Sequence, residues 1–233
     1  DTQSEAEALL APLAQAALDA EPRFAGKLFD PEEAVRYAQQ HAGSSRPTII
    51  ADAQDNPGAG SNSDSTGMIR ALVACKATNA AIGLIVDPAS AAKAHAAGEG
   101  SRVRLSLGGK SGVEGDTPYE AEFVVEKISN GKVEATGPYY RGFKLDLGLS
   151  ACLRIDGVRI VVASQKVQMA DQAMFRFVGI EPTEQDILVV KSAVHFRALR
   201  VRHAQSYQRV NSANASDACL AGGCGSRYCA GVG

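Results

Sequence analysis

The run ADAQDNPGAGSNSD holds the densest group of residue types in the chain that could bind a ligand. The carboxylates of Asp52 and Asp55, with the amide of Asn56, offer oxygen atoms of the kind that hard cations prefer. Gly58 and Gly60 would let backbone N–H groups approach a phosphate or a carboxylate closely. The alternative is a structural turn in which Asp and Asn side chains bond to their own backbone. The spacing matches no P-loop, GxGxxG fingerprint or calcium loop, so these interpretations stay open.

A second polar cluster, KSAVHF, directly follows the strongest strand-like run of the sequence, DILVV. It contains Lys191, Ser192 and His195. In open α/β sheets, ligands collect at the carboxyl ends of the strands. His195 could therefore act as a general base, a metal ligand or an orienting group, although a hydrogen-bonded structural histidine is the commoner case.

Two further stretches place polar groups beside predicted strands. LGGKSG pairs two glycines with a lysine and a serine, which fits an anion cradle or a plain hairpin loop equally well. SQKVQMADQAM brings four polar side chains to a strand-to-helix turn, where the aspartate could simply cap the helix: Lys166, Gln168, Asp171 and Gln172.

Metal-binding patterns are weak throughout the sequence. There is no HExxH motif and no visible set of three zinc ligands before residue 198. Cys219, Cys224 and Cys229 are regularly spaced near the end, and His203 could be a fourth ligand, but the gaps are unlike those of structural zinc sites. The sequence therefore predicts no metal ligand within this chain.

The elements that must position these residues change character along the chain. Before residue 100, helices are predicted over 3–20, 31–40, 66–77 and 88–97, with strands over 47–51 and 81–86. After residue 101 the pattern favours strands, over 102–107, 120–127, 132–136, 151–155, 158–163 and 186–191, with a short helix over 170–177. The sequence thus predicts an α/β fold, with a mixed sheet and flanking helices in the first half and a mainly antiparallel, strand-rich second half.

Local signals support several of the predicted boundaries. Asp30 and Asp87 each precede a proline, which is typical of a helix N-cap and first turn. Asn130-Gly131 and Asp156-Gly157 are predicted to be two-residue hairpin turns. After about residue 198 the periodicity stops, and no further element is expected.

Composition excludes several classes of partner. The chain has 233 residues, is 45% hydrophobic and carries a formal net charge of −2, so neither nucleic acid nor a membrane is expected as a partner. Five cysteines, an odd number without a visible secretion signal, favour a reducing compartment, and a cytoplasmic location is predicted.

Four stretches resemble, in order, landmarks of the microcystinase C family of metallopeptidase-like proteins: ADAQDNPGAGSNSDSTGMIRAL, SLGGKSG, SQKVQMADQAMFRFVGIEP and VVKSAVHFRA. On this basis residues 1–198 are expected to form a C-terminal region of that family, with an α/β part over about 1–100 and a strand-rich part over about 101–198. Residues 199–233 depart from the family pattern, and they are expected to be a disordered or frameshifted tail.

The resemblance implies a function for the whole protein. The chain would be the C-terminal, cleft-completing part of a zinc-dependent peptidase-like hydrolase that cleaves a peptide or amide bond. Zinc would come from an N-terminal region that this sequence lacks, so the chain alone is expected to be inactive. The implied partners are that region and a peptide or amide substrate.

The resemblance also assigns roles to residues. It makes His195 a catalytic residue and the others substrate-binding or interface residues: Asp52, Asp55, Asn56, Gly58, Gly60, Lys191 and Ser192. A purely structural role for the same loop, which would pin this region against its partner, stays open. The alternative to the enzyme is a stand-alone α/β module that binds an anionic small molecule through the glycine-rich loop.

Overall fold

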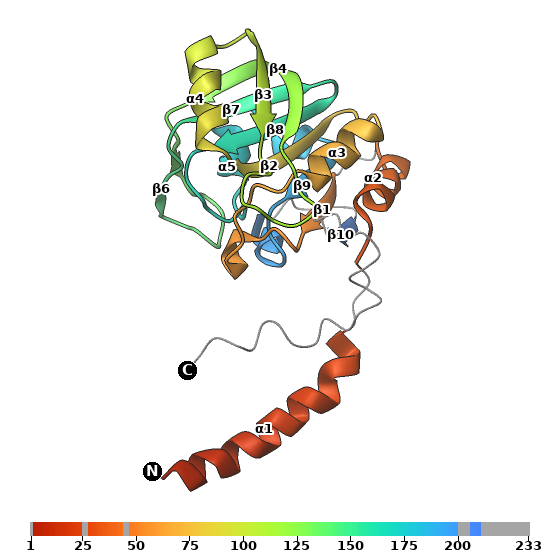
Figure 1. Cartoon of the computed structure of the whole chain (residues 1–233), viewed down its shortest axis with the longest axis vertical. Coiled ribbons are helices and arrows are strands. Elements are labelled where there is room, and N and C mark those ends of the chain that lie inside the picture. Colours follow the sequence, from red (N-terminus) through yellow and green to blue (C-terminus); the bar gives the residue numbers. More distant parts are fainter. Residues whose placement is uncertain (1, 25–27, 44–46, 200–205, 211–233) are drawn as a thin grey trace.

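The computed structural model of the chain describes residues 2–24, 28–43, 47–199 and 206–210 (Figure 1). The predicted α/β class with a mixed sheet is confirmed. One eight-stranded sheet runs through the body, in the order β10-β1-β9-β2-β8-β7-β4-β3. Its strands are β10 (Ser206–Val210), β1 (Thr48–Asp52), β9 (Ile187–Val190), β2 (Ala80–Val86), β8 (Val158–Ala163), β7 (Ser150–Ile155), β4 (Tyr119–Ser129) and β3 (Arg102–Leu107).

The sheet changes from parallel to antiparallel at β8. Strands β10, β1, β9, β2 and β8 are parallel, whereas β7, β4 and β3 extend the sheet as antiparallel neighbours. The two halves of the chain are not separate layers, because β9 from the second half lies between β1 and β2 from the first half. The carboxyl ends of β1, β9, β2 and β8 therefore meet at one edge, and in open α/β sheets this edge is where ligands bind.

Both faces of the sheet are covered, and strands β1 and β9 are accordingly buried along their whole length, as is β2 up to its last residue. Helices α2 (Pro31–Gln40), α3 (Gly67–Ala74) and α4 (Pro88–Ala97) pack on one face. The short helix α5 (Ala173–Arg176) and the segment after it pack on the other face. The predicted N-caps are confirmed, since Asp30 accepts from the N–H of Glu32 and Asp87 from that of Ser90.

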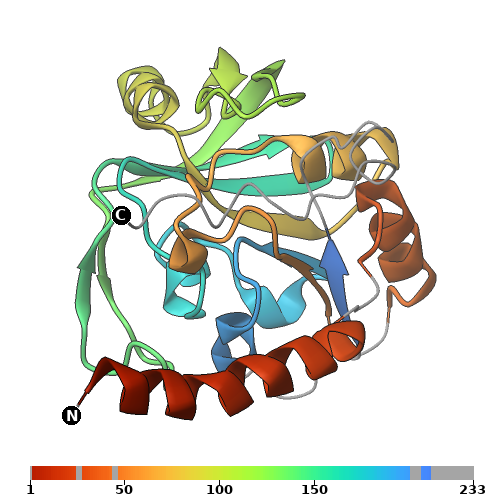
Figure 2. The same ribbon diagram turned by 60° about the horizontal axis from the view of Figure 1, so that its bottom comes forward.

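The prediction that Asn130-Gly131 closes a hairpin is wrong. Strand β4 pairs with β7 up to the Ser129–Ser150 pair, and the chain then leaves the sheet. Strands β5 (Lys132–Glu134) and β6 (Lys144–Asp146) form a separate two-stranded ribbon, seen as the green pair at the left of Figure 2. The glycine serves close packing instead, because a Cβ on Gly131 would lie 2.0 Å from the Gly148 carbonyl oxygen. The predicted hairpin at Asp156-Gly157 is confirmed between β7 and β8.

Helix α1 (Gln3–Phe24) lies apart from the body of the molecule, below it in Figure 1. Its leucines at positions 9, 10, 13 and 18 are all exposed. No helix within the described ranges has the length and the apolar character needed to cross a bilayer.

The expectation that no element follows residue 198 is wrong for one short run. Residues 206–210 form β10, which pairs in parallel with β1 and extends the sheet by one strand. The cysteine-rich remainder of the tail, with His203, lies outside the described residues.

Candidate functional site

A buried ion network joins the two polar clusters that the sequence singled out. The Lys191 Nζ atom lies 2.8 Å from an oxygen of Asp52 and 2.8 Å from an oxygen of Asp55. It also donates to the carbonyl and hydroxyl oxygens of Ser65, at 3.0 and 2.7 Å. The lysine and both aspartates are buried, although Lys191 is 139 residues from Asp52 in the chain. This network ties the loop after β1 to the end of β9.

In this network, the opposite charges offset the effect of burial on the pKa values of Lys191 and Asp55. Burial alone would lower the pKa of Lys191, but the charges of Asp52 and Asp55 outweigh it and raise that pKa. Burial would likewise raise the pKa of Asp55, but Lys191 and hydrogen bonds from Ser65 lower it to about 2. Lys191 and Asp55 are therefore both charged at neutral pH, and each has the other as a partner.

This arrangement gives Asp52, Asp55 and Lys191 a structural task. Asp55 additionally accepts from the N–H groups of Ser63 and Ser65, at 2.7 and 2.8 Å, so it fixes the far end of the loop. Direct contact of these three residues with a substrate stays a prediction. The geometry favours the structural alternative, because their charged groups are enclosed and already bonded.

The glycine-rich loop does not form an anion cradle. Asn56 caps the 3-10 helix Pro57–Ala59 by accepting from the N–H of Gly58 at 3.1 Å. The N–H of Gly60 donates to the Pro57 carbonyl, with Gly60 in the left-handed conformation at φ 95°. Since these N–H groups are used within the loop, the proposed anion-binding module loses the feature on which it rested.

The LGGKSG stretch is likewise bonded to the protein's own carboxylates. The N–H of Gly108 and the Lys110 Nζ atom donate to Asp87, at 3.0 and 2.6 Å. The N–H of Lys110 donates to Asp64 at 2.9 Å. The stretch therefore anchors the end of β3 beside the end of β2, and the anion-cradle interpretation fails here too.

An exposed histidine stands at the same edge of the sheet, held by a buried glutamine. Gln168, from the turn after β8, donates from Nε2 to the Ser192 hydroxyl and contacts His195 Nδ1, both at 3.0 Å. Gly58 closes the other side, because a Cβ there would lie only 2.5 Å from the Gln168 Oε1 atom. The structure thus brings together Gly58, Ser192 and His195 from the predicted set, with Gln168 between them.

The contact with Gln168 determines what the histidine can do. With the amide oriented as in the structure, Nδ1 of neutral His195 accepts a hydrogen bond, so the ring proton lies on Nε2. The ring of Tyr139 packs against the imidazole at 4.4 Å between centroids. His195 is exposed, so its Nε2–H can donate to a bound carbonyl or developing oxyanion. A donor role fits this geometry better than the general-base role considered from the sequence.

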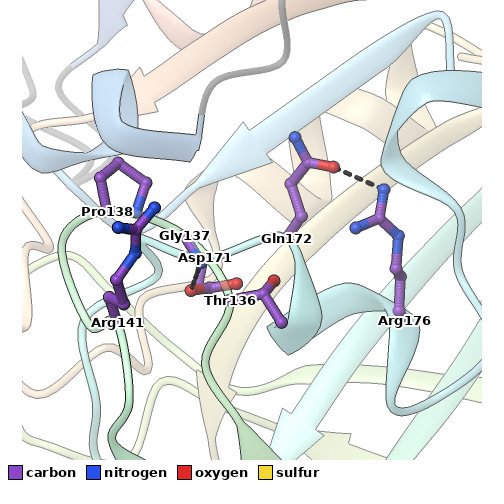
Figure 3. Close-up of a pocket in the computed structure, with 7 residues that line it drawn as sticks. All are labelled: Thr136, Gly137, Pro138, Arg141, Asp171, Gln172 and Arg176. Carbon is purple, nitrogen blue, oxygen red and sulfur yellow. Dashed lines mark hydrogen bonds between the residues drawn. The ribbon is translucent and has the colours of Figure 1, made fainter.

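A cavity of about 420 Å³ lies between α5 and the segment that joins β5 to β6 (Figure 3). Arg176 is already engaged on its wall, with two bonds to Glu181 and one to Gln172. The bond from Arg176 lowers the pKa of Glu181 to about 2, so this pair is ionised. The wall is made of Thr136, Gly137, Pro138, Arg141, Asp171, Gln172 and Arg176.

The segment between β5 and β6, which lines one side of the cavity, was not predicted to belong to the site. The segment GPYYRG lies between two short strands and shows no periodicity. Only its composition could have indicated a role in the site, since two tyrosines and an arginine between glycines are unusual for a solvated turn. Tyr139 and Tyr140 both face the site, because Tyr140 donates to the carbonyl of Gln168 at 3.3 Å.

The described residues do not fit a zinc ion. No group of three or more His, Cys, Asp or Glu side chains in the described part of the chain is arranged to hold a metal. Asp52 and Asp55, the strongest carboxylate candidates, share Lys191 instead. The described residues therefore offer no set of ligands on which a metal-assisted step could rest.

Comparison with known proteins places this chain in a family. The sequence profile of the MlrC C-terminus family matches residues 50–225. The chain belongs to the MlrC C-terminus family. The matched range runs past residue 198, so the similarity does not stop where the hydrophobic pattern does.

A curated relative agrees with the MlrC assignment, and a solved structure shares the fold. The chain is 31% identical over 156 residues to "Microcystinase C" of Sphingomonas sp, covering 67% of this chain and 30% of the relative. The chain therefore spans about a third of that protein's length. A crystal structure from Mesorhizobium sp. BNC1, named "Putative metallopeptidase", superposes with a TM-score of 0.74 at 23% identity. It covers 84% of this chain and 39% of that one, and it shows the shared fold.

Proposed function

We propose that the chain supplies the C-terminal, cleft-completing part of a peptidase-like hydrolase that cleaves a peptide or amide bond. The observation that carries this proposal is the exposed His195, fixed by Gln168 where the carboxyl ends of the parallel strands meet. Membership of the MlrC C-terminus family, with a relative named microcystinase C, supports the same reading.

The chain's own residues would bind and position the substrate. His195 would donate from Nε2 to the oxygen of the scissile carbonyl as negative charge develops on it. Gln168, Ser192 and Tyr139 would act as positioning residues, since they fix the ring and its tautomer. Asp52, Asp55 and Lys191 would hold the loop that closes one side of the cleft.

A second region of the protein would complete the cleft. Zinc, which the resemblance to microcystinase C implies, would be held there, because the described residues offer no fitting set of ligands. Tyr139 and Val194 are 42% and 47% exposed beside His195, and a packed neighbour would cover such apolar side chains. The cytoplasmic location predicted from the cysteine content remains part of this proposal.

Two linked experiments test the proposed function. The coding DNA upstream of residue 1 should open in frame into a region rich in His, Asp and Glu. The longer polypeptide, supplied with zinc, should then hydrolyse a linear peptide, and His195→Ala should slow it about 100-fold, as for the loss of one oxyanion donor. His41→Ala is the control, because His41 stacks on Tyr37 at the end of α2. An upstream stop codon, or equal rates for the two variants, would overturn the proposal.

A further inference from the structure

The cavity between α5 and the segment that joins β5 to β6 contains two hydrogen-bond donors that the protein does not use. Within the described ranges, neither the guanidinium of Arg141 nor the hydroxyl of Thr136 has a hydrogen-bond or ion-pair partner. Both residues are exposed and line the same cavity from the segment between β5 and β6 (Figure 3). An arginine presents planar donors that match a carboxylate in two-point contact.

The remaining charges of the cavity are already bonded. Arg176 is held by Glu181 and Gln172. Asp171 is fully buried, and its two oxygens accept from the backbone N–H groups of Gly137 and Ala173, at 2.6 and 2.9 Å. Arg141 makes no ion pair with Asp171, so its positive charge stays available to a ligand.

One short turn connects this cavity to the candidate site. Tyr139 packs on His195, while its neighbours Pro138 and Arg141 line the cavity. A peptide whose carbonyl lies at His195 could therefore extend along this turn into the cavity.

We propose that the cavity is a substrate subsite in which Arg141, assisted by Thr136, binds a carboxylate group of the peptide or amide substrate. This inference rests on the proposed function for the identity of the ligand. The carboxylate could be the chain terminus of a peptide or the side chain of an acidic residue, and both share the same chemistry.

A titration of the ¹⁵N-labelled 233-residue chain followed by NMR tests this proposal. The three probes are acetyl-Ala-Ala with a free terminal carboxylate, acetyl-Glu amide with a side-chain carboxylate, and the neutral acetyl-Gln amide. The reporter is the N–H resonance of Gly137, which lies in the cavity wall. Arg141→Gln is the test variant, and Arg104→Gln on β3 is the matched control, because Arg104 is also exposed and has no hydrogen-bond or ion-pair partner among the residues that the structure describes.

At least one carboxylate probe should shift the Gly137 resonance, and the neutral probe should not. Arg141→Gln should weaken that binding about tenfold or more, as for losing a hydrogen-bonded charge partner, and Arg104→Gln should leave it unchanged. The probe that binds identifies the source of the carboxylate. Equal binding of the neutral probe, no binding of either carboxylate at tens of millimolar, or no effect of Arg141→Gln would overturn the inference.

The result is independent of catalysis. The titration needs neither a metal nor hydrolysis, so carboxylate binding can hold even if the proposed function fails. Conversely, if the longer polypeptide hydrolyses peptides but Arg141→Gln changes nothing in the titration, only the subsite is wrong.

Discussion

Replacing Lys191 by methionine should destabilise the fold more than any surface substitution. The change removes the cation but leaves the buried carboxylates of Asp52 and Asp55, which then lack a counter-charge. Breaking a buried ion pair by removing one partner costs about 3–5 kcal/mol. Asp55 keeps its bonds from Ser63 and Ser65, so we expect the lower end, about 3 kcal/mol.

Urea denaturation at neutral pH, with the midpoint and slope fitted together, measures this loss. The matched control is Lys132→Met, because Lys132 pairs with Asp146 on the surface, where both side chains are more than half exposed. Such a pair contributes about 0–1 kcal/mol. If Lys191→Met does not fold, Ser65→Ala removes one donor to Asp55 and one acceptor of Lys191, and should cost about 1–2 kcal/mol.

The pH dependence distinguishes a buried charge from a packing defect. In Lys191→Met the carboxylate of Asp55 loses the charge that lowers its pKa, and burial should then raise that pKa above the value in the unfolded chain. The stability of the variant should therefore recover as the pH falls and Asp55 becomes protonated. A loss below 1 kcal/mol, equal to that of Lys132→Met, would refute the assignment of Lys191 to a buried ion network. A larger loss that does not change with pH would refute its electrostatic origin.

Two further predictions follow from the same geometry. Gly58→Ala should change stability little, because the added Cβ meets only the end of the Gln168 side chain, but it should displace Gln168 from His195. The NMR resonances of the His195 ring should then differ from those of the unchanged chain, and identical ring resonances would contradict the contact. Acid should destabilise the unchanged chain through Asp55, whose lowered pKa of about 2 contributes stability that is complete above its unfolded pKa of 3.8. Urea midpoints should therefore decline between about pH 4 and pH 2, and Asp55→Asn should flatten that decline. An equally steep decline in the variant would contradict the role of Asp55.

Local patterning was sufficient to predict most of the fold. Apolar β-branched runs gave the parallel strands, and the Asp-Pro pairs gave the starts of α2 and α4. The order of the strands was not predictable in this way, because pairing over long sequence separations is not encoded in any one window. The insertion of β9 between β1 and β2, and the pairing of β10 with β1, are of this kind.

In the candidate site, too, local patterns were predictable and contacts between distant residues were not. The loop after β1 and the cluster after β9 were both predicted to contribute to the site, the second because ligands collect at the carboxyl ends of strands in open α/β sheets. What the sequence could not show was that Lys191 and the two aspartates would use each other as partners. That outcome depends on distances between residues far apart in the chain. For the same reason, no pattern in the sequence connected Arg141 with His195.

We propose that this chain binds and positions a substrate, and that another region of the protein holds the catalytic metal. The most direct test is the zinc content of the purified 233-residue chain after dialysis, together with its hydrolysis of a linear peptide with zinc present. The variant with Ser at positions 219, 224 and 229 should be used, so that zinc on the tail thiols is not counted. We predict less than one zinc per chain and no hydrolysis. One firmly bound zinc per chain with zinc-dependent hydrolysis would contradict the claim.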